Sequence, residues 1–192
     1  MLCVAMLAGC TSAPPRNPDN LCAIFQDRPA WHRAAQDAER AWGAPVFVPM
    51  AIMYQESSFR AKARPPRRYV LGVIPWGRVS TAYGYTQALD STWGQYRQET
   101  GNRFASRSDF ADSVDFIAWY MHKSRQINGI AMNDAYRHYL NYHEGWTGYR
   151  RGSYTRKAWL LPVARRVESR ARTYAAQYAG CRDDLPRRRW PF

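Results

Sequence analysis

The stretch that decides the fold is an apolar run ending on one acidic residue: residues 49–59 read PMAIMYQESSF. Pro49 suits the first turn of a helix, where no backbone N–H is needed. On that helix Glu56 follows Ile52 and Met53 at spacings of four and three residues, so its own face is hydrophobic. A carboxyl group there loses hydration near the negative end of the helix dipole, which favours the protonated form. The run therefore predicts a helix that ends on a proton donor, although Glu56 alone could equally cap the helix or pair with an arginine.

Three further motifs follow Glu56 along the chain. Residues 80–87 read STAYGYTQ, residues 88–93 read ALDSTW, and residues 141–145 read NYHEG. Together with residues 55–59 they resemble, in order and spacing, the motifs of the soluble lytic transglycosylase family, which is related to goose-type lysozyme. The similar region covers roughly residues 44–178, and its first motif, Glu-Ser-x-Phe, carries the family's catalytic acid.

Two of these motifs depart from the family pattern. Gly84 and Gln87 match the family's Gly-Leu-Met-Gln, whereas the two residues between them differ. Tyr142 matches the family's Ala-Tyr-Asn-Ala-Gly, whereas His143 replaces its asparagine. The altered motifs leave open a non-catalytic peptidoglycan-binding protein on the same scaffold, although a pure binder has no need of an acid at Glu56.

The resemblance implies a mainly α, lysozyme-like fold with one short irregular or β-hairpin segment near residues 65–80. It also implies that peptidoglycan glycan strands are the substrate and that a single carboxylate acts first as acid and then as base. In this mechanism Glu56 protonates the oxygen between N-acetylmuramic acid (MurNAc) and N-acetylglucosamine (GlcNAc). It then deprotonates the muramoyl 6-hydroxyl, whose intramolecular attack gives a 1,6-anhydro sugar.

The resemblance and the side-chain chemistry together assign a set of substrate-binding residues. All but the last lie in the matched motifs, and the last resembles a tyrosine that the family carries later in the chain: Ser57, Gly84, Tyr85, Gln87, Asn141, Tyr142, His143, Glu144 and Tyr154. Gly84 would let the backbone approach the sugar chain, and the Gln87 amide suits hydroxyl or acetamido groups. Tyr142 would offer a flat face and a hydroxyl. The alternatives are a surface amide for Gln87 and plain core aromatics for Tyr142 and Tyr154.

Glu144 raises the possibility of a different reaction. A hydrolase needs a second carboxylate, either to activate water or to act as nucleophile, and Glu144 lies in the right motif for that role. We expect it instead to be structural or to position substrate, because the enzymes that the chain resembles manage with one carboxylate.

The N-terminus predicts export and a lipid anchor. Residues 1–9 carry no charge and end in Leu-Ala-Gly before Cys10, which resembles the lipobox of bacterial lipoproteins. The alternative is an ordinary apolar tail. By the resemblance, residues 1–9 are the remnant of a signal peptide, Cys10 carries the lipid that contacts the membrane, and residues 10–21 form a polar tether. Thr11 after the cysteine implies a periplasmic location at the outer membrane.

Two cysteines, Cys22 and Cys181, remain in the mature chain and flank the region that we expect to fold. In an oxidising periplasm they are expected to form a disulfide, unless they are two unrelated buried thiols. The expected domain therefore spans residues 22–181, is monomeric and is followed by a basic tail, residues 182–192. No zinc motif is present, so we expect no metal and no cofactor.

The net charge of +13 predicts a polyanionic partner. Nucleic acid, anionic lipid and an anionic wall polymer all fit the charge, but a lipobox and the absence of a recognition motif argue against nucleic acid. The arginines before Gly84 are either a solvated basic loop or contacts for the carboxylates of peptide stems or muramic lactyl groups: Arg64, Arg67, Arg68 and Arg78.

Helical periodicity and turn residues predict where the helices lie. We expect helices at about residues 30–42, 49–56, 90–100, 109–127, 133–143 and 156–178. Residues 69–74 could form a small strand or one arm of a hairpin.

Overall fold

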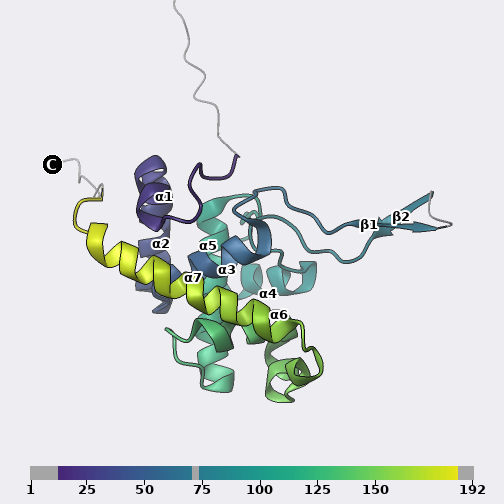
Figure 1. Cartoon of the computed structure of the whole chain (residues 1–192). Coiled ribbons are helices and arrows are strands. Elements are labelled where there is room, and N and C mark those ends of the chain that lie inside the picture. The colour runs from purple at the N-terminus through teal and green to yellow at the C-terminus, as the bar shows by residue number, and fades with distance from the viewer. Residues whose placement is uncertain (1–12, 71–73, 186–192) are drawn as a thin grey trace, which may run out of the picture.

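The computed structural model describes residues 13–70 and 74–185, and Figure 1 shows that helices make up most of the fold. Its helices are α1 Leu21–Asp27, α2 Pro29–Trp42, α3 Phe47–Ser57, α4 Asp90–Thr100, α5 Phe110–Asn128, α6 Ala135–Arg150, the short 3₁₀ helix η1 Ser153–Arg156 and α7 Leu160–Cys181. Its strands are β1 Arg67–Val70 and β2 Ile74–Arg78. The predicted mainly α, lysozyme-like fold is confirmed, and a hairpin occupies the predicted region near residues 65–80.

Side-chain caps explain where several of these helices begin. The Asn20 side chain accepts a hydrogen bond from the backbone N–H of Ala23 at the start of α1. Asp109 and Asp134 do the same at the starts of α5 and α6. A cap of this kind satisfies an N–H group that the helix itself cannot pair. The cap at Asn20 begins a helix that the sequence analysis did not predict, because α1 is too short for a clear hydrophobic period.

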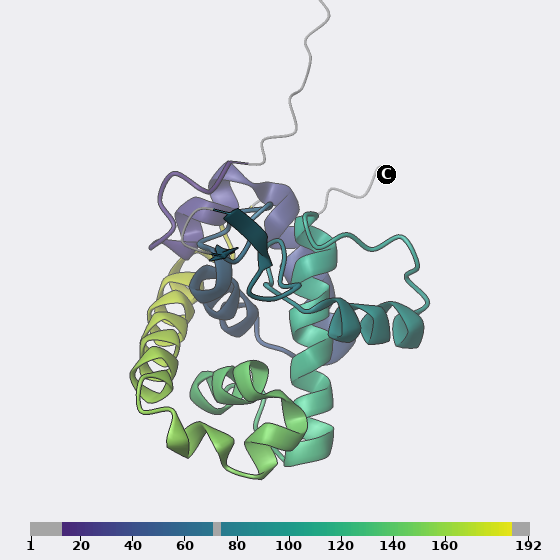
Figure 2. The same ribbon diagram turned by 90° about the vertical axis from the view of Figure 1, so that its right-hand side faces the viewer.

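The apolar helix α3 lies inside the domain. Every residue from Val48 to Met53 is buried, because α3 packs against α5, α6 and α7. Figure 2 shows α3 between α7 and α5, with α6 below it. A helix that is apolar on all sides needs such enclosure. The same packing fixes where its last turn, and therefore Glu56, can point.

The two strands form an antiparallel hairpin in which Arg67 faces Arg78 and Val70 faces Ile74. The hairpin projects away from the helical body (Figure 1). Its base leads directly into residues 79–89, which return the chain to the start of α4. The second sequence motif, residues 80–87, therefore follows the hairpin directly and lies near the end of α3.

The two cysteines of the folded region are joined. Cys22 at the start of α1 and Cys181 at the end of α7 form a disulfide, with their Cα atoms 6.1 Å apart. The predicted pairing is confirmed. It closes a loop that contains almost the whole described chain.

Residues 13–20 differ from the tether expected at residues 10–21. The Tyr174 hydroxyl donates to the carbonyl of Pro18, Arg170 pairs with Asp19 at 2.7 Å, and Arg28 donates to the carbonyl of Ala13 at 2.6 Å. The expectation counted only large apolar residues, whereas these contacts are polar and use backbone carbonyls. The domain therefore includes residues before Cys22.

Part of the sequence-based picture lies outside the described residues. This applies to the expected signal remnant at residues 1–9, to Cys10 and to the basic tail from residue 186 onward. Among the helices that the structure describes, none is both long and apolar enough to cross a membrane.

Candidate active site

Glu56 lies in the last turn of α3 and lines a pocket of about 320 Å³. The pocket is built from the end of α3, the turn before α4, the middle of α5 and the kinked part of α6. Its lining residues are Glu56, Gln87, Ala88, Leu89, Thr92, Phe116, Tyr120, Tyr142, His143, Glu144 and Gly145. Five residues that the sequence analysis selected are thus brought together: Glu56, Gln87, Tyr142, His143 and Glu144.

Burial raises the pKa of the Glu56 carboxyl from its ordinary value near 4.5 to about 7. A hydrogen bond from the Tyr139 hydroxyl opposes this shift, because it stabilises the ionised form. Removal from water is the larger effect, as expected for a carboxyl on an apolar helix face. Glu56 can therefore both give and take a proton near neutral pH.

Aromatic side chains form one wall of this pocket. The Tyr142 hydroxyl donates to the carbonyl of Thr86 at 2.8 Å, which ties α6 to the turn before α4. Tyr120 stacks on Trp146 with ring centres 4.7 Å apart, and Phe116 meets the Tyr142 ring edge-on. Flat apolar surfaces with hydroxyl groups at their edges suit the faces of sugar rings.

Gln87 supports the pocket in a different way from the one expected. Its side-chain nitrogen donates to the carbonyls of Ala63 at 3.0 Å and Gly84 at 2.9 Å. Both amide hydrogens are therefore used, one to hold the turn against the loop after α3 and one within the turn itself. Only the amide oxygen remains to meet a ligand, so of the donor and acceptor functions that an amide offers, the acceptor alone is left for a sugar.

Glu144 is held on three sides. It accepts hydrogen bonds from Lys157 at 2.6 Å, from His143 at 2.9 Å and from the Ser153 hydroxyl, and its side chain is only 3% exposed. Burial opposes ionisation, but the three donors outweigh it and lower the pKa of the carboxyl to about 2. The group is a fixed anion that ties α6 to the segment before α7.

Gly84 and Tyr85 do not line this pocket. A Cβ atom at Gly84 would lie 2.0 Å from the carbonyl oxygen of Arg107, and the residue has a φ of +77°. The glycine is therefore required by a close backbone approach from Arg107, which corrects the expected approach of a sugar. Tyr85 is buried, with its ring edge-on to Trp31 and Phe110.

Ser57 and Tyr154 also lie outside the pocket lining. Ser57 is buried and its hydroxyl donates to the carbonyl of Met53 one turn earlier on α3. Tyr154 stacks on Tyr149 with ring centres 5.4 Å apart. Both side chains support the elements that carry the pocket.

Asn141 also lies outside the pocket lining. It is fully buried; its amide donates to the Ser124 hydroxyl at 2.7 Å and its carbonyl oxygen accepts from Asn128 at 2.7 Å. A buried amide needs such partners on both sides. Its role is to pin α6 to α5, behind the aromatic wall.

The sequence analysis did not select Tyr139, which donates a hydrogen bond to Glu56, or Thr92 and Tyr120, which line the pocket. Tyr139 and Tyr142 are three residues apart on α6, so they lie on one helix face. That spacing was a usable signal, but it fits a core stripe equally well. Among the described residues, no group of three acidic, histidine or cysteine side chains could hold a metal ion.

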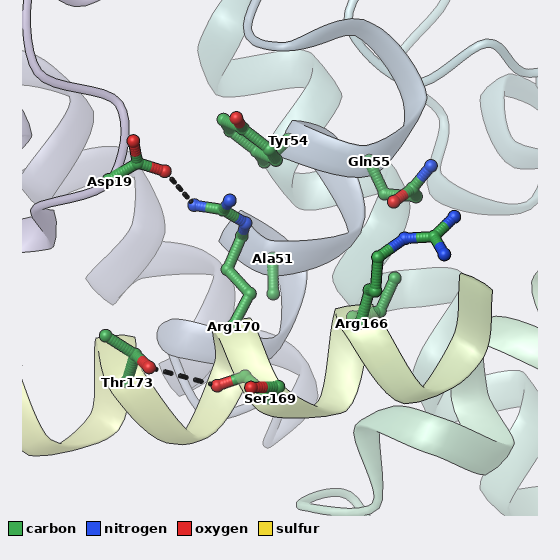
Figure 3. Close-up of a pocket in the computed structure, with 9 residues that line it drawn as sticks. Asp19, Ala51, Tyr54, Gln55, Arg166, Ser169, Arg170 and Thr173 are labelled. Atoms are coloured by element: carbon green, nitrogen blue, oxygen red, sulfur yellow. Dashed lines mark hydrogen bonds and ion pairs between the residues drawn. The ribbon is translucent and has the colours of Figure 1, made fainter. Parts of the chain in front are cut away.

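A second pocket, of about 410 Å³, lies between α3 and α7 (Figure 3). Its carboxylate, Asp19, is paired with Arg170, whose guanidinium group also lies over the ring of Tyr54. The side chain of Gln55 and that of Arg166 approach from opposite helices. Among the described residues, the one carboxylate that lines this pocket is held in an ion pair, and Glu56 does not line it.

A helical domain whose inner helix ends on a protonatable glutamate, facing an aromatic wall, is of the lysozyme-like class. The chain belongs to the transglycosylase SLT domain family, whose sequence model matches residues 1–181. A search of curated proteins found no match to the chain. Membership of this family supports a peptidoglycan-cleaving function of the lytic transglycosylase type, with glycan strands as the binding partner.

Proposed function

We propose that this protein cleaves the β-1,4 bond between MurNAc and GlcNAc in peptidoglycan and leaves a 1,6-anhydro-MurNAc end, with Glu56 as the catalytic residue. The observation that carries the proposal is the state of Glu56. Of the two carboxyl groups that line the pocket, Glu56 is the one with a pKa, about 7, near the pH at which the enzyme would work. The other carboxyl, Glu144, is locked as an anion.

The reaction needs two proton transfers, and one carboxyl can make both. Protonated Glu56 gives its proton to the glycosidic oxygen as the bond to GlcNAc breaks. The resulting carboxylate is stabilised by the hydroxyl of Tyr139 and then takes the proton of the muramoyl 6-hydroxyl, which attacks its own anomeric carbon. A pKa near the working pH keeps both steps favourable, and no water is consumed.

The bonding of Glu144 argues against the alternative of a hydrolase. A general base must have a free lone pair aimed at a water molecule and an appreciable affinity for its proton. Glu144 has a pKa of about 2, and Lys157, Ser153 and His143 occupy its oxygens. Because Glu144 lines the same pocket, the test below also distinguishes hydrolysis from the proposed reaction.

The test is a digest of purified peptidoglycan by residues 11–192, with released muropeptides identified by mass spectrometry. We expect anhydro-ended products from the wild type and a loss of roughly 10²- to 10⁴-fold with Glu56→Gln. Glu168→Gln is the matched control, because Glu168 pairs with Arg172 on the outer part of α7; it should cleave at the wild-type rate.

The other outcomes each contradict the proposal in a distinct way. Reducing ends, formed by water, would mean a hydrolase, and Glu144→Gln would then be expected to abolish activity. Absence of any soluble product while the wild-type protein still sediments with the wall would mean a peptidoglycan-binding protein without catalysis.

We also propose that the protein is anchored in the outer membrane, facing the periplasm, by lipid on Cys10. The support is the sequence around Cys10, since this residue lies outside the described residues. Mass spectrometry of the N-terminal peptide from the membrane fraction should find a diacylglycerol group on Cys10. Recovery of unmodified wild-type protein in the soluble fraction, equal to that of Cys10→Ala, would contradict this proposal.

A further inference from the structure

A third pocket, of about 580 Å³, carries three arginines. We call it the basic pocket and define it by Arg64, Arg78 and Arg107, together with Tyr83 and Asp90. Its members come from the loop after α3, the end of β2, the turn before α4 and the loop before α5. Segments distant in sequence therefore converge on one concave, positively charged surface.

The three arginines are not equivalent. Arg107 donates to the carbonyls of Thr81 at 3.1 Å and Ala88 at 2.7 Å and pairs with Asp90 at 2.6 Å. Its guanidinium group is thus used within the protein, and so is the carboxylate of this pocket. Arg107 acts as a structural brace for the turn before α4.

Arg64 and Arg78 retain hydrogen-bond donors. The Arg64 guanidinium lies over the ring of Tyr83, 4.4 Å from its centre, and Arg78 donates from one terminal nitrogen to the carbonyl of Pro65 at 2.7 Å. No ion pair among the described residues involves either arginine. Stacking orients Arg64, and the hydrogen bond to a backbone carbonyl orients Arg78, before any anion is bound. Binding an anion therefore costs less side-chain conformational entropy.

The basic pocket and the active site share one turn. Ala88 and Leu89 line the active site, and Tyr83 and Asp90, on either side of them in sequence, line the basic pocket. Tyr83 and Ala88 also form a β-bridge across the turn. A glycan strand bound at Glu56 therefore has the basic pocket beside it, within reach of a branch of the strand.

We propose that the basic pocket binds carboxylates of the peptide stem that branches from MurNAc, through Arg64 and Arg78. This inference rests on the proposed function. A stem peptide carries several carboxylates along a short chain, and guanidinium groups recognise carboxylates with paired hydrogen bonds. The muramic lactyl group is a different source of the same chemistry, but its carboxyl is free only after the stem has been removed.

Binding is tested first without catalysis, on the full chain carrying Glu56→Gln. Titration calorimetry would compare a stem tetrapeptide having free carboxylates with the same peptide amidated at each carboxylate. We expect the free peptide to bind at least tenfold more tightly, and Arg64→Gln or Arg78→Gln to weaken it about tenfold or more. Arg33→Gln on α2 is the matched control for the loss of one positive charge and should change affinity less than twofold.

Equal binding of the two peptides, or arginine variants that bind like the control, would overturn the inference. Thermal unfolding of each variant within a few degrees of the wild type shows that a lost affinity is not lost folding. Arg78→Lys adds a second check, because it keeps the charge but loses the paired geometry, so its affinity should fall between those of wild type and Arg78→Gln.

The second experiment uses the catalytic protein on intact peptidoglycan and on glycan stripped of its stems by an amidase. Arg64→Gln should slow cleavage of intact material through KM and leave cleavage of stripped glycan unchanged. An equal loss on both substrates would assign the pocket to glycan or lactyl groups and refute a stem site. If no protein cleaves either substrate while peptide binding still depends on Arg64 and Arg78, the proposed function fails and the stem site stands.

Discussion

At the scale of single residues, Glu56 illustrates how one partly buried carboxyl links acid chemistry to stability. Its pKa is raised from 4.5 to about 7 by burial, so between these values the folded protein binds a proton that the unfolded chain has released. Stability must therefore fall as the pH rises through this range. The raised pKa that suits Glu56 for acid chemistry therefore makes the folded protein less stable at alkaline pH.

Replacing Glu56 by glutamine should remove this pH dependence. We expect the wild type to lose about 3 kcal/mol of unfolding free energy relative to Glu56→Gln between pH 4.5 and pH 8. Denaturant unfolding of both proteins at several pH values measures the difference. A constant difference across this range would mean that Glu56 keeps its ordinary pKa.

Gly84 gives a second residue-scale prediction, with a control inside the same chain. Gly84→Ala should destabilise the domain by about 3 kcal/mol or more, because a Cβ atom would meet the Arg107 carbonyl at 2.0 Å in a left-handed conformation. Gly43 has a similar φ of +74° but no atom within 4 Å of such a Cβ, so Gly43→Ala should cost only about 1 kcal/mol. Equal thermal shifts for the two variants would contradict a close approach at Gly84.

These two positions also show what a sequence can predict about a site. The acid at Glu56 could be inferred because its neighbours Ile52 and Met53 are local, and helix geometry is enough to place them beside it. The reason for Gly84 could not, because Arg107 reaches it only through the tertiary fold. Gln87 was selected correctly as a pocket residue, but its donors are used by backbone carbonyls that no local pattern reveals.

At the scale of elements, α6 is kinked where it borders the pocket, which Glu144 and Gly145 line. Gly145 has φ 73° and ψ 163°, which interrupt the helix immediately after Glu144. The bonds from Glu144 to Lys157 and Ser153 then fix η1 and the segment before α7 beside the kink. The sequence analysis ended this helix at residue 143 and began the next at 156, so it missed the helical turn that continues to Arg150 and the contacts of Glu144 with the segment before α7.

Glu144→Gln should therefore damage stability more than catalysis. We expect a loss of about 2 kcal/mol at pH 6, since the charge-assisted bonds to Lys157 and His143 are weakened, with peptidoglycan cleavage kept within about tenfold. Because the folded pKa of about 2 lies below the ordinary value near 4.5, this stability is present above pH 4.5 and is lost as the pH falls towards 2. Glu168→Gln, at a more exposed pair, should cost only about 0.5 kcal/mol; equal losses would count against the anchoring role.

At the scale of the whole molecule, the disulfide joins the first and last helices. Cys22 and Cys181 are 159 residues apart in sequence, so the bond restricts almost the entire unfolded chain. The double variant with both cysteines replaced by serine should lose about 5 kcal/mol in the chain-entropy model. Denaturant unfolding with and without reductant measures this loss: reductant should lower the wild type to the level of the variant and leave the variant unchanged.

The disulfide was predictable from the number of cysteines and the expected export, whereas the fold of residues 13–20 was not. When only two cysteines remain, their pairing can be predicted without knowing which residues surround them. The contacts of Pro18 and Asp19 depend on Tyr174 and Arg170, which lie at the other end of the sequence and come near only when α7 has packed. Polar contacts of this kind leave no hydrophobic pattern to detect.

With the proposed lipid anchor on Cys10, those contacts would limit how far from the bilayer the protein can act. If Cys10 carries lipid, only Thr11 and Ser12 separate it from Ala13, whose carbonyl is already bound by Arg28. That distance is at most about 11 Å, whereas free residues 10–21 could have extended to roughly 40 Å. Bond cleavage would then be confined to the thin layer of wall nearest the outer membrane, and strands farther from this membrane would be cut only after they had come closer to it.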